Sequence, residues 1–157
     1  MKGNEKVIEK LNDLLSDELT AISQYMVHGE MCDNWGYERL HEMVEKRAMD
    51  EMKHAERLIG RIIFLEGIPM VSRLKKMHIG ADVEKQLMND AKSEEEAVQS
   101  YNDGIRLSVE LADNGSRELL ESILKDEERH LDELEAQHDQ IKQMGIQNYL
   151  AEQIKKG

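Results

Sequence analysis

The chain has 157 residues, 34% of them charged, with a formal net charge of −12 at pH 7 and a single proline. This length suits one domain, residues 1–157, and the scarcity of aromatic residues favours long helices over sheet. The acidic charge argues against nucleic acid or an anionic membrane as a partner. No apolar run approaches the roughly 20 residues of a membrane span, and no signal-peptide segment opens the chain. Cys32 has no second cysteine to pair with, so we expect a cytoplasmic protein.

Apolar residues spaced three and four apart predict four long amphipathic helices. The first ends near the turn signal at 33–36, and the second fades at 67–69. The third precedes a turn signal at 113–115, after which the fourth runs to Gly145, a plausible C-cap. A short fifth helix is expected over 146–155. The apolar stripes consist of Ile8, Leu11, Leu15, Ile22 and Tyr25; Leu40, Val44, Leu58, Ile62 and Leu65; Val83, Leu87, Ala91, Val98, Tyr101 and Ile105; and Leu120, Ile123, Leu134, Ile141 and Met144.

The connections between these segments predict the topology. Short turns join the first helix to the second and the third to the fourth, so each pair should form an antiparallel hairpin. Residues 66–81 have one proline and no helical stripe. At about 3.3 Å per residue this stretch is long enough to run the length of a helix. The expected fold is therefore an all-α four-helix bundle with one long crossover and a short C-terminal fifth helix.

Charged residues interrupt the apolar stripes at regular places. The stripe of each helix contains one glutamate, and two helices add a histidine three residues after it. Helical spacing turns all of these side chains toward the core. The inward-facing residues are Glu18, Glu51, His54, Glu94, Glu127 and His130.

An internal repeat supports this set. Glu18, Tyr25, Asp50, Glu51 and His54 each have a residue of the same type 76 positions later. Within each predicted hairpin the two glutamates are 33 residues apart, so they should meet at one level of the bundle. Five matches at one offset make coincidence a poor explanation.

Buried carboxylates need compensating charge. Four glutamates and two neutral histidines would offset the charge of two divalent metal ions. A glutamate from each of two helices with Glu-x-x-His from each of the other two is the pattern of di-iron and di-manganese bundles. Mixed imidazole and carboxylate ligation suits iron or manganese better than structural zinc.

Four further residues are candidates for a supporting role. Asp50 and Asp126 each precede a glutamate of the set and could accept a hydrogen bond from a ligand histidine, which would fix its tautomer. An ordinary exposed aspartate is the alternative. Tyr25 and Tyr101 lie two turns from Glu18 and Glu94, and each could hydrogen-bond to a metal-ligand side chain or supply an electron. A tyrosine that only fills the core is the alternative for each.

The chain resembles the bacterioferritins, a haem-binding family of ferritin-like proteins, over nearly its whole length. The resemblance rests on the following segments: MKGNEKVIEKLN, SDELTAISQY, DNWG, DEMKHAERLI, FLEGIP, IGADVEKQL, ILKDEERHLDELE and GIQNYLAEQ. The segment DEMKHAE is the most specific, because it contains Glu51, Met52 and His54.

The resemblance implies iron storage in a hollow shell of twenty-four identical subunits, with ferric mineral inside. It also implies a b-type haem on a two-fold axis, ligated by Met52 of each of two subunits. Met52 lies about 100° round the helix from Glu51, which suits an outward position. Lys46 is a departure, because some members carry an iron-binding histidine there. Asn34, Glu66, Asp132 and Asp139 are candidate pore or cavity residues, although solvated faces explain them equally well.

The leading functional hypothesis is a ferroxidase. Two ferrous ions would bind the six inward residues and be oxidised by dioxygen or hydrogen peroxide, with Tyr25 as an auxiliary residue and a ferredoxin-type protein as the electron donor for iron release. A rubrerythrin-like peroxidase is the rival, but the chain has no C-x-x-C rubredoxin motif. Two further rivals are a helical scaffold with a structural metal site and a miniferritin, whose iron site lies between subunits.

Overall fold

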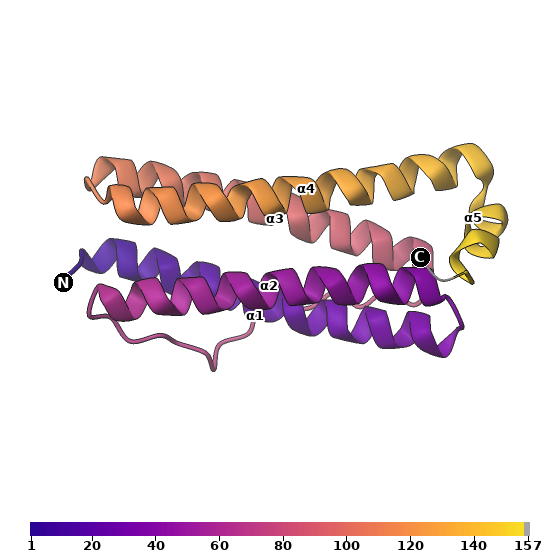
Figure 1. Ribbon diagram of the computed structural model, residues 1–157, viewed down its shortest axis with the longest axis horizontal. Helices are drawn as coiled ribbons and strands as arrows, with labels where there is room; N and C mark the ends of the chain where they lie inside the picture. The colour runs from indigo at the N-terminus through magenta and orange to yellow at the C-terminus, as the bar shows by residue number, and fades with distance from the viewer. Residues whose placement is uncertain (156–157) are drawn as a thin grey trace.

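The computed structural model describes residues 1–155, and these contain helices but no strands. Five helices follow one another along the chain (Figure 1): α1 (Glu5–Asn34), α2 (Glu38–Phe64), α3 (Val83–Glu110), α4 (Asn114–Met144) and α5 (Ile146–Gln153). The predicted all-α bundle is therefore confirmed, and the last two residues of the chain lie outside the described part.

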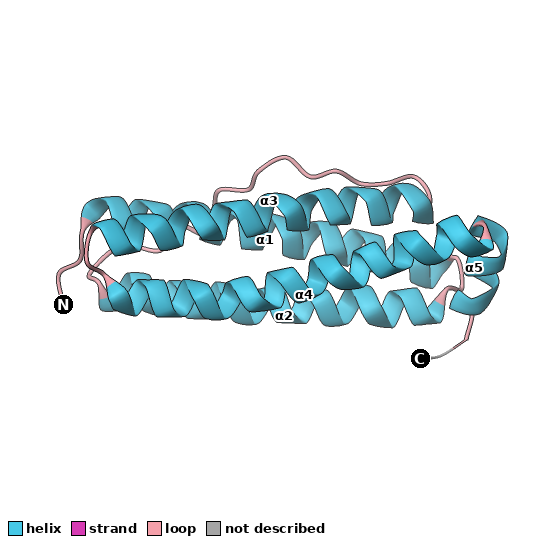
Figure 2. Cartoon of the chain, turned by 90° about the horizontal axis from the view of Figure 1, so that it is seen from above, coloured by secondary structure: helices cyan, strands magenta, loops and turns pink. Residues whose placement is uncertain are grey.

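The four long helices form two hairpins, as the short turns predicted. α1 packs against α2 and α3 packs against α4, and the two hairpins lie face to face (Figure 1). Residues 65–82, which we call the crossover, run outside the bundle along the side that α1 and α3 form (Figure 2). The short helix α5 lies across the end of the bundle that is opposite the N-terminus (Figure 1).

A row of polar side chains on α1 fastens the crossover to the bundle. Ser16 donates to the carbonyl of Arg73 at 2.9 Å, and the Lys75 amide donates to Thr20 Oγ1 at 2.8 Å. Further along, the His78 amide donates to Gln24 Oε1 at 3.0 Å. A row spaced four residues apart thus binds successive backbone groups of an otherwise irregular segment. The complete row is Asn12, Ser16, Thr20, Gln24 and His28.

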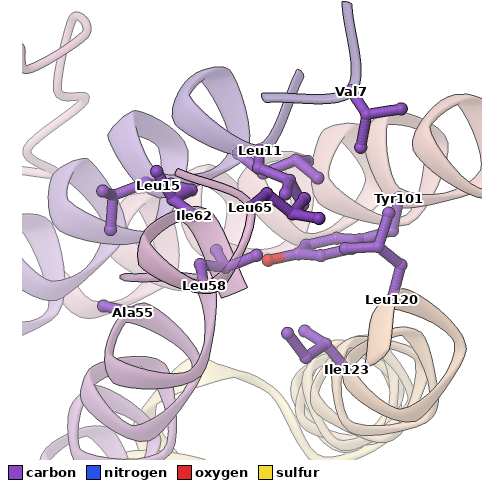
Figure 3. Packing of buried hydrophobic residues seen from close by; sticks show 11 residues of the cluster. Val7, Leu11, Leu15, Ala55, Leu58, Ile62, Leu65, Tyr101, Leu120 and Ile123 are labelled. Atoms are coloured by element: carbon purple, nitrogen blue, oxygen red, sulfur yellow. The ribbon is translucent and has the colours of Figure 1, made fainter. Parts of the chain in front are cut away.

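An apolar cluster fills the bundle at the N-terminal end of α1, and we call it the apolar end. Figure 3 shows Leu58, Ile123 and Leu120 gathered around the ring of Tyr101, with residues of α1 above them. Gly104 permits the close approach of α3 and α4 here, because a Cβ at this position would come within 2.9 Å of Leu120 Cδ1. The buried members of the cluster are Val7, Leu11, Leu14, Leu15, Ala55, Leu58, Ile62, Leu65, Tyr101, Leu120 and Ile123.

The other half of the bundle has a different interior. Gln24, His28, Arg47 and Asp90 are all buried there, and we call these four residues the polar layer. His28 contacts Asp90 Oδ1 through Nδ1 at 2.9 Å and accepts from the Gly80 amide through Nε2 at 3.0 Å. A second apolar cluster closes this end, formed by Cys32, Leu40, Val83, Leu87, Leu134, Ile141 and Tyr149.

Two details differ from the sequence prediction. α5 ends at Gln153 rather than at Lys155. Met144, placed in the apolar stripe of the fourth helix, is exposed at the last residue of α4, just before the chain turns at Gly145, where φ is +81°. No described helix is long and apolar enough to cross a membrane.

Candidate metal centre

All six inward residues predicted from the sequence meet in the middle of the bundle. They form two overlapping groups in which the ligand atoms lie within 4.8 Å of one another. Glu51 and Glu127 belong to both groups, which is the arrangement of two bridging carboxylates. The first group is completed by Glu18 and His54, and the second by Glu94 and His130.

The two histidines point their Nδ1 atoms into this cluster from opposite sides. His54 Nδ1 lies 2.9 Å from Glu127 Oε1, and His130 Nδ1 lies 3.0 Å from Glu51 Oε1. The two imidazole centroids are 6.3 Å apart. Each histidine therefore approaches a carboxylate of the opposite hairpin, and nitrogen and oxygen donors converge on the same small volume.

Several buried nitrogen and oxygen atoms of the cluster make no hydrogen bond in the described part of the chain. Within residues 1–155, the buried side-chain nitrogen and oxygen atoms that have no hydrogen-bond partner belong only to the six residues and to Arg47. A buried polar atom without a partner costs about 1–3 kcal/mol. Such atoms are rare in folded proteins, and their concentration at one point indicates a bound cation that satisfies them. The donor set, carboxylate oxygens with imidazole nitrogens, suits iron or manganese.

Aspartates hold the far side of each histidine ring, in a crosswise pattern. His54 Nε2 donates to Asp126 Oδ2 at 2.8 Å, and His130 Nε2 donates to Asp50 Oδ2 at 2.9 Å. An ionised aspartate can only accept, so it keeps the ring proton on Nε2 and leaves Nδ1 free to bind a metal. The sequence predicted aspartates in this role, and the structure adds that each comes from the opposite hairpin.

The two tyrosines repeat the crosswise pattern. Tyr25 of α1 donates its hydroxyl proton to Glu94 of α3. Tyr101 of α3 donates to Glu18 of α1 at 2.6 Å. Each tyrosine thus orients a carboxylate of the other hairpin. Both are more than core filling, because each hydroxyl is bonded directly to one of the six residues.

Without metal, the cluster must hold protons. Burial raises the pKa of Glu51 and of Glu127 well above the ordinary value, and neighbouring carboxylates add to this effect. Burial lowers the pKa of His54, but the carboxylates of Glu127 and Glu18 outweigh burial and raise it to about 11. A metal ion that binds here must displace these protons, so its apparent affinity rises with pH.

Arg47 is the buried residue whose importance sequence reasoning missed. It stands on the α2 stripe one turn before Glu51, and only 2% of it is exposed. Its guanidinium carbon lies 5.4 Å from the centroid of the Tyr25 ring, while its three nitrogens make no hydrogen bond within residues 1–155. The signal was present, because the spacing that turns Glu51 inward turns Arg47 inward too.

A cavity of about 450 Å³ opens between α1, α3 and the crossover and reaches the centre from outside. The glutamates of the centre line its floor, and Asp17, Lys75 and Asp103 lie among its other lining residues. We call this cavity the outer pocket. It gives the centre contact with solvent on the side that the crossover covers.

The remaining candidates from the sequence lie away from the centre. Met52 is 41% exposed on α2. Lys46 lines a separate pocket between α2 and α4 together with Asp50 and Arg129. The four candidate pore or cavity residues are exposed in the single chain, which does not separate a pore from an ordinary surface; they are Asn34, Glu66, Asp132 and Asp139.

Comparison with known proteins gives a consistent result. Residues 8–144 match the model of the family described as Ferritin, ferritin-like domain. The chain is 41% identical to a bacterioferritin of Brucella melitensis over 149 residues, which cover 95% of this chain and 92% of that protein. It is 38% identical to a bacterioferritin of Mycobacterium avium over 152 residues, covering 97% and 96%. A bacterioferritin of Rhodobacter capsulatus is 38% identical over 149 residues, covering 95% and 92%.

Proposed function

The chain belongs to the bacterioferritin family of ferritin-like proteins, and we propose that it is an iron-storage ferroxidase. The observation that carries this proposal is the set of converging, unpartnered donor atoms in the middle of the bundle. Its substrate is ferrous iron, and its oxidant is dioxygen or hydrogen peroxide. Its product is ferric iron, which is stored as mineral.

The residues of the centre have distinct roles in this proposal. Glu51 and Glu127 bridge two ferrous ions, since both belong to the two donor groups. Glu18 with His54 and Glu94 with His130 act as terminal ligands. Two ferrous ions give up one electron each, so the pair reduces one dioxygen with two protons to hydrogen peroxide, or one peroxide to two waters. Tyr25 and Tyr101 hold the terminal carboxylates in place through their hydroxyl protons.

Storage requires an assembly. We propose a shell of twenty-four identical subunits, supported by the membership of the family and by the matching of almost the whole chain to its relatives. An acidic subunit with a net charge of −12 suits a shell that attracts ferrous ions.

We also propose that Met52 ligates a b-type haem between two subunits. An exposed methionine on α2 fits this role, because 41% of Met52 is accessible and can contact a group shared with a second chain. The haem would supply an electron path for reductive release of iron. A ferredoxin-type donor is the expected partner for that step.

The direct test adds ferrous iron and air to the apoprotein, counts the iron oxidised per subunit, and follows that iron on a sizing column. Uptake far beyond about two ions per subunit, travelling with a very large assembly, supports storage. Uptake that stops near two with a small oligomer contradicts storage and favours the rival, a peroxide-reducing di-iron enzyme.

Two variants test the residue roles. Glu127→Ala should abolish rapid oxidation, whereas Glu128→Ala, which removes an exposed glutamate from the same helix, should not. Met52→Leu should lose the haem Soret band while the assembly stays intact. Met49→Leu is the matched control, because Met49 is exposed on the same helix. Rapid oxidation in Glu127→Ala, or an unchanged Soret band in Met52→Leu, would contradict the assignment.

A further inference from the structure

The outer pocket connects the centre with the surface on the side of α1 and α3. Carboxylate oxygens without hydrogen-bond partners lie at its inner end, among them Glu18 Oε2 and both oxygens of Glu127. These side chains are buried to more than nine-tenths, and the pocket is lined by them. Carboxylate oxygens that make no hydrogen bond to a described residue therefore line the inner end of a cavity that opens to solvent.

A cationic side chain already occupies the mouth of this passage. The ammonium group of Lys75 lies 2.8 Å from Asp13 Oδ1 and also forms an ion pair with Asp17. Asp17 lines the outer pocket and precedes Glu18 in the chain, whereas Asp13 does not line it. The mouth thus holds one positive charge between a carboxylate on the path and a carboxylate beside it.

The backbone of Lys75 is hydrogen-bonded to α1, while its side chain is held by ion pairs and is partly exposed. The Lys75 amide donates to Thr20 Oγ1, one of the bonds that fasten the crossover to α1. The Lys75 side chain is 44% exposed. Ion pairs at this exposure contribute little to stability, so a divalent cation can readily replace the ammonium group.

We propose that the outer pocket is the route by which the ferrous substrate reaches the centre, with Asp17 as a transit ligand that the incoming ion takes over from Lys75. This inference rests on the proposed function for the identity of the metal. Carboxylate oxygen is a suitable donor for a partly hydrated divalent ion in passage. Lys75 then acts as an exchangeable counter-ion that keeps Asp17 paired until an ion arrives.

The test measures loading with Co²⁺, which reports occupancy of the centre by its visible absorbance and needs no oxidant. Asp17→Asn should slow Co²⁺ loading of the assembled apoprotein by about threefold or more, since a charge at the mouth raises the association rate of a cation. Lys75→Gln should speed loading, because Asp17 loses its competing cation. Asp13→Asn is the control: it removes the same charge and another partner of Lys75, but from beside the path, and should load at nearly the wild-type rate.

Each outcome bears on the proposal. Equal rates for Asp17→Asn and Asp13→Asn would overturn it. So would a lower final Co²⁺ count in Asp17→Asn, since Asp17 would then support the centre rather than the route. A wild-type protein that loads Co²⁺ with the expected order of variants but oxidises no ferrous iron would contradict the proposed function and leave the route intact. The same variants in ferrous oxidation at low iron should follow the same order.

Discussion

The polar layer and the apolar end lie on opposite sides of the candidate metal centre, at positions that the internal repeat makes equivalent. Arg47 corresponds to Ile123, 76 residues later, and Asp90 corresponds to Leu14. His28 corresponds to Gly104. The six inward Glu and His residues, the two tyrosines and the two aspartates are repeated, but their surroundings are not. Duplicated ligand geometry is therefore compatible with opposite kinds of packing around it.

The crossover explains part of this difference. It passes over the bundle only once, and Gln24 and His28 bind its backbone at His78 and Gly80. Asp90 supports both of these side chains, because Gln24 Nε2 donates to it at 2.8 Å and His28 contacts it at 2.9 Å. A polar interior is thus needed where an irregular segment must be fixed. Arg47 has no such explanation, since its guanidinium makes no hydrogen bond to any described residue.

The largest effect is expected at the apolar end. Leu58→Ala should destabilise the protein by about 2–5 kcal/mol, because Leu58 is fully buried and its loss leaves a cavity. Chemical denaturation of the metal-free protein measures this loss. Leu74→Ala, at an exposed position in the crossover, is the control and should change little. A loss below about 1 kcal/mol in Leu58→Ala would mean that this end contributes less to stability than its burial indicates.

Arg47→Met should raise the free energy of unfolding, whereas Leu58→Ala should lower it. Replacing a buried charge that has no hydrogen bonds with an apolar side chain of similar length should stabilise the metal-free protein by about 1–4 kcal/mol. The same denaturation measurement applies, with Arg57→Met on an exposed face of α2 as the control. Destabilisation by Arg47→Met would show that the Arg47 charge interacts favourably with Asp90 and Glu133. The polar layer would then stabilise the fold as the apolar end does.

His28→Leu should cost about 1–3 kcal/mol, because it leaves the Gly80 amide without a partner and removes one of the two side-chain contacts of the buried Asp90 carboxylate. Besides lowering global stability, the substitution should loosen the crossover near Gly80. Hydrogen exchange at the Gly80 amide should accelerate more than exchange at the Lys75 amide, which Thr20 binds. Equal acceleration at both amides would indicate that the crossover opens as one unit.

The smallest effect is expected at the turn beside the apolar end. Asp113 caps α4 through the Ser116 amide and pairs with Arg61 at 2.8 Å. Burial raises the pKa of Asp113, but hydrogen bonds from Ser116 and Arg61 outweigh it, and the folded-state pKa falls below 3.8. Its contribution is therefore complete above pH 3.8 and is lost as the pH falls through the lowered folded-state pKa.

Asp113→Ala should accordingly cost about 1 kcal/mol at neutral pH. The difference from wild type should shrink in acid, which denaturation at a series of pH values measures. Tyr37, at the start of α2, has no side-chain cap hydrogen bond and provides the contrasting turn. A pH-independent cost for Asp113→Ala would assign the effect to lost packing instead of to the charge.

The sequence predicted the inward positions of the six Glu and His residues well, because helical period and internal repeat act on every residue alike. Glu18, Glu94 and their partners were placed inward by helical spacing, and that is where they lie. The crosswise bonds, such as Tyr25 to Glu94, could not be predicted, because they depend on which helices of the two hairpins lie side by side. The row on α1 that holds the crossover is equally regular in the sequence, but its partners are backbone groups, which leave no pattern.

The crosswise bonds also determine how the molecule can come apart. Each hairpin supplies side chains that hydrogen-bond to candidate ligands of the other: Asp126 bonds to His54, Asp50 to His130, and Tyr101 to Glu18. Neither hairpin by itself contains a complete coordination site with its supports. A bound pair of metal ions would therefore cross-link the two hairpins. A chain cut within the crossover would regain its centre only when the two fragments reassociate.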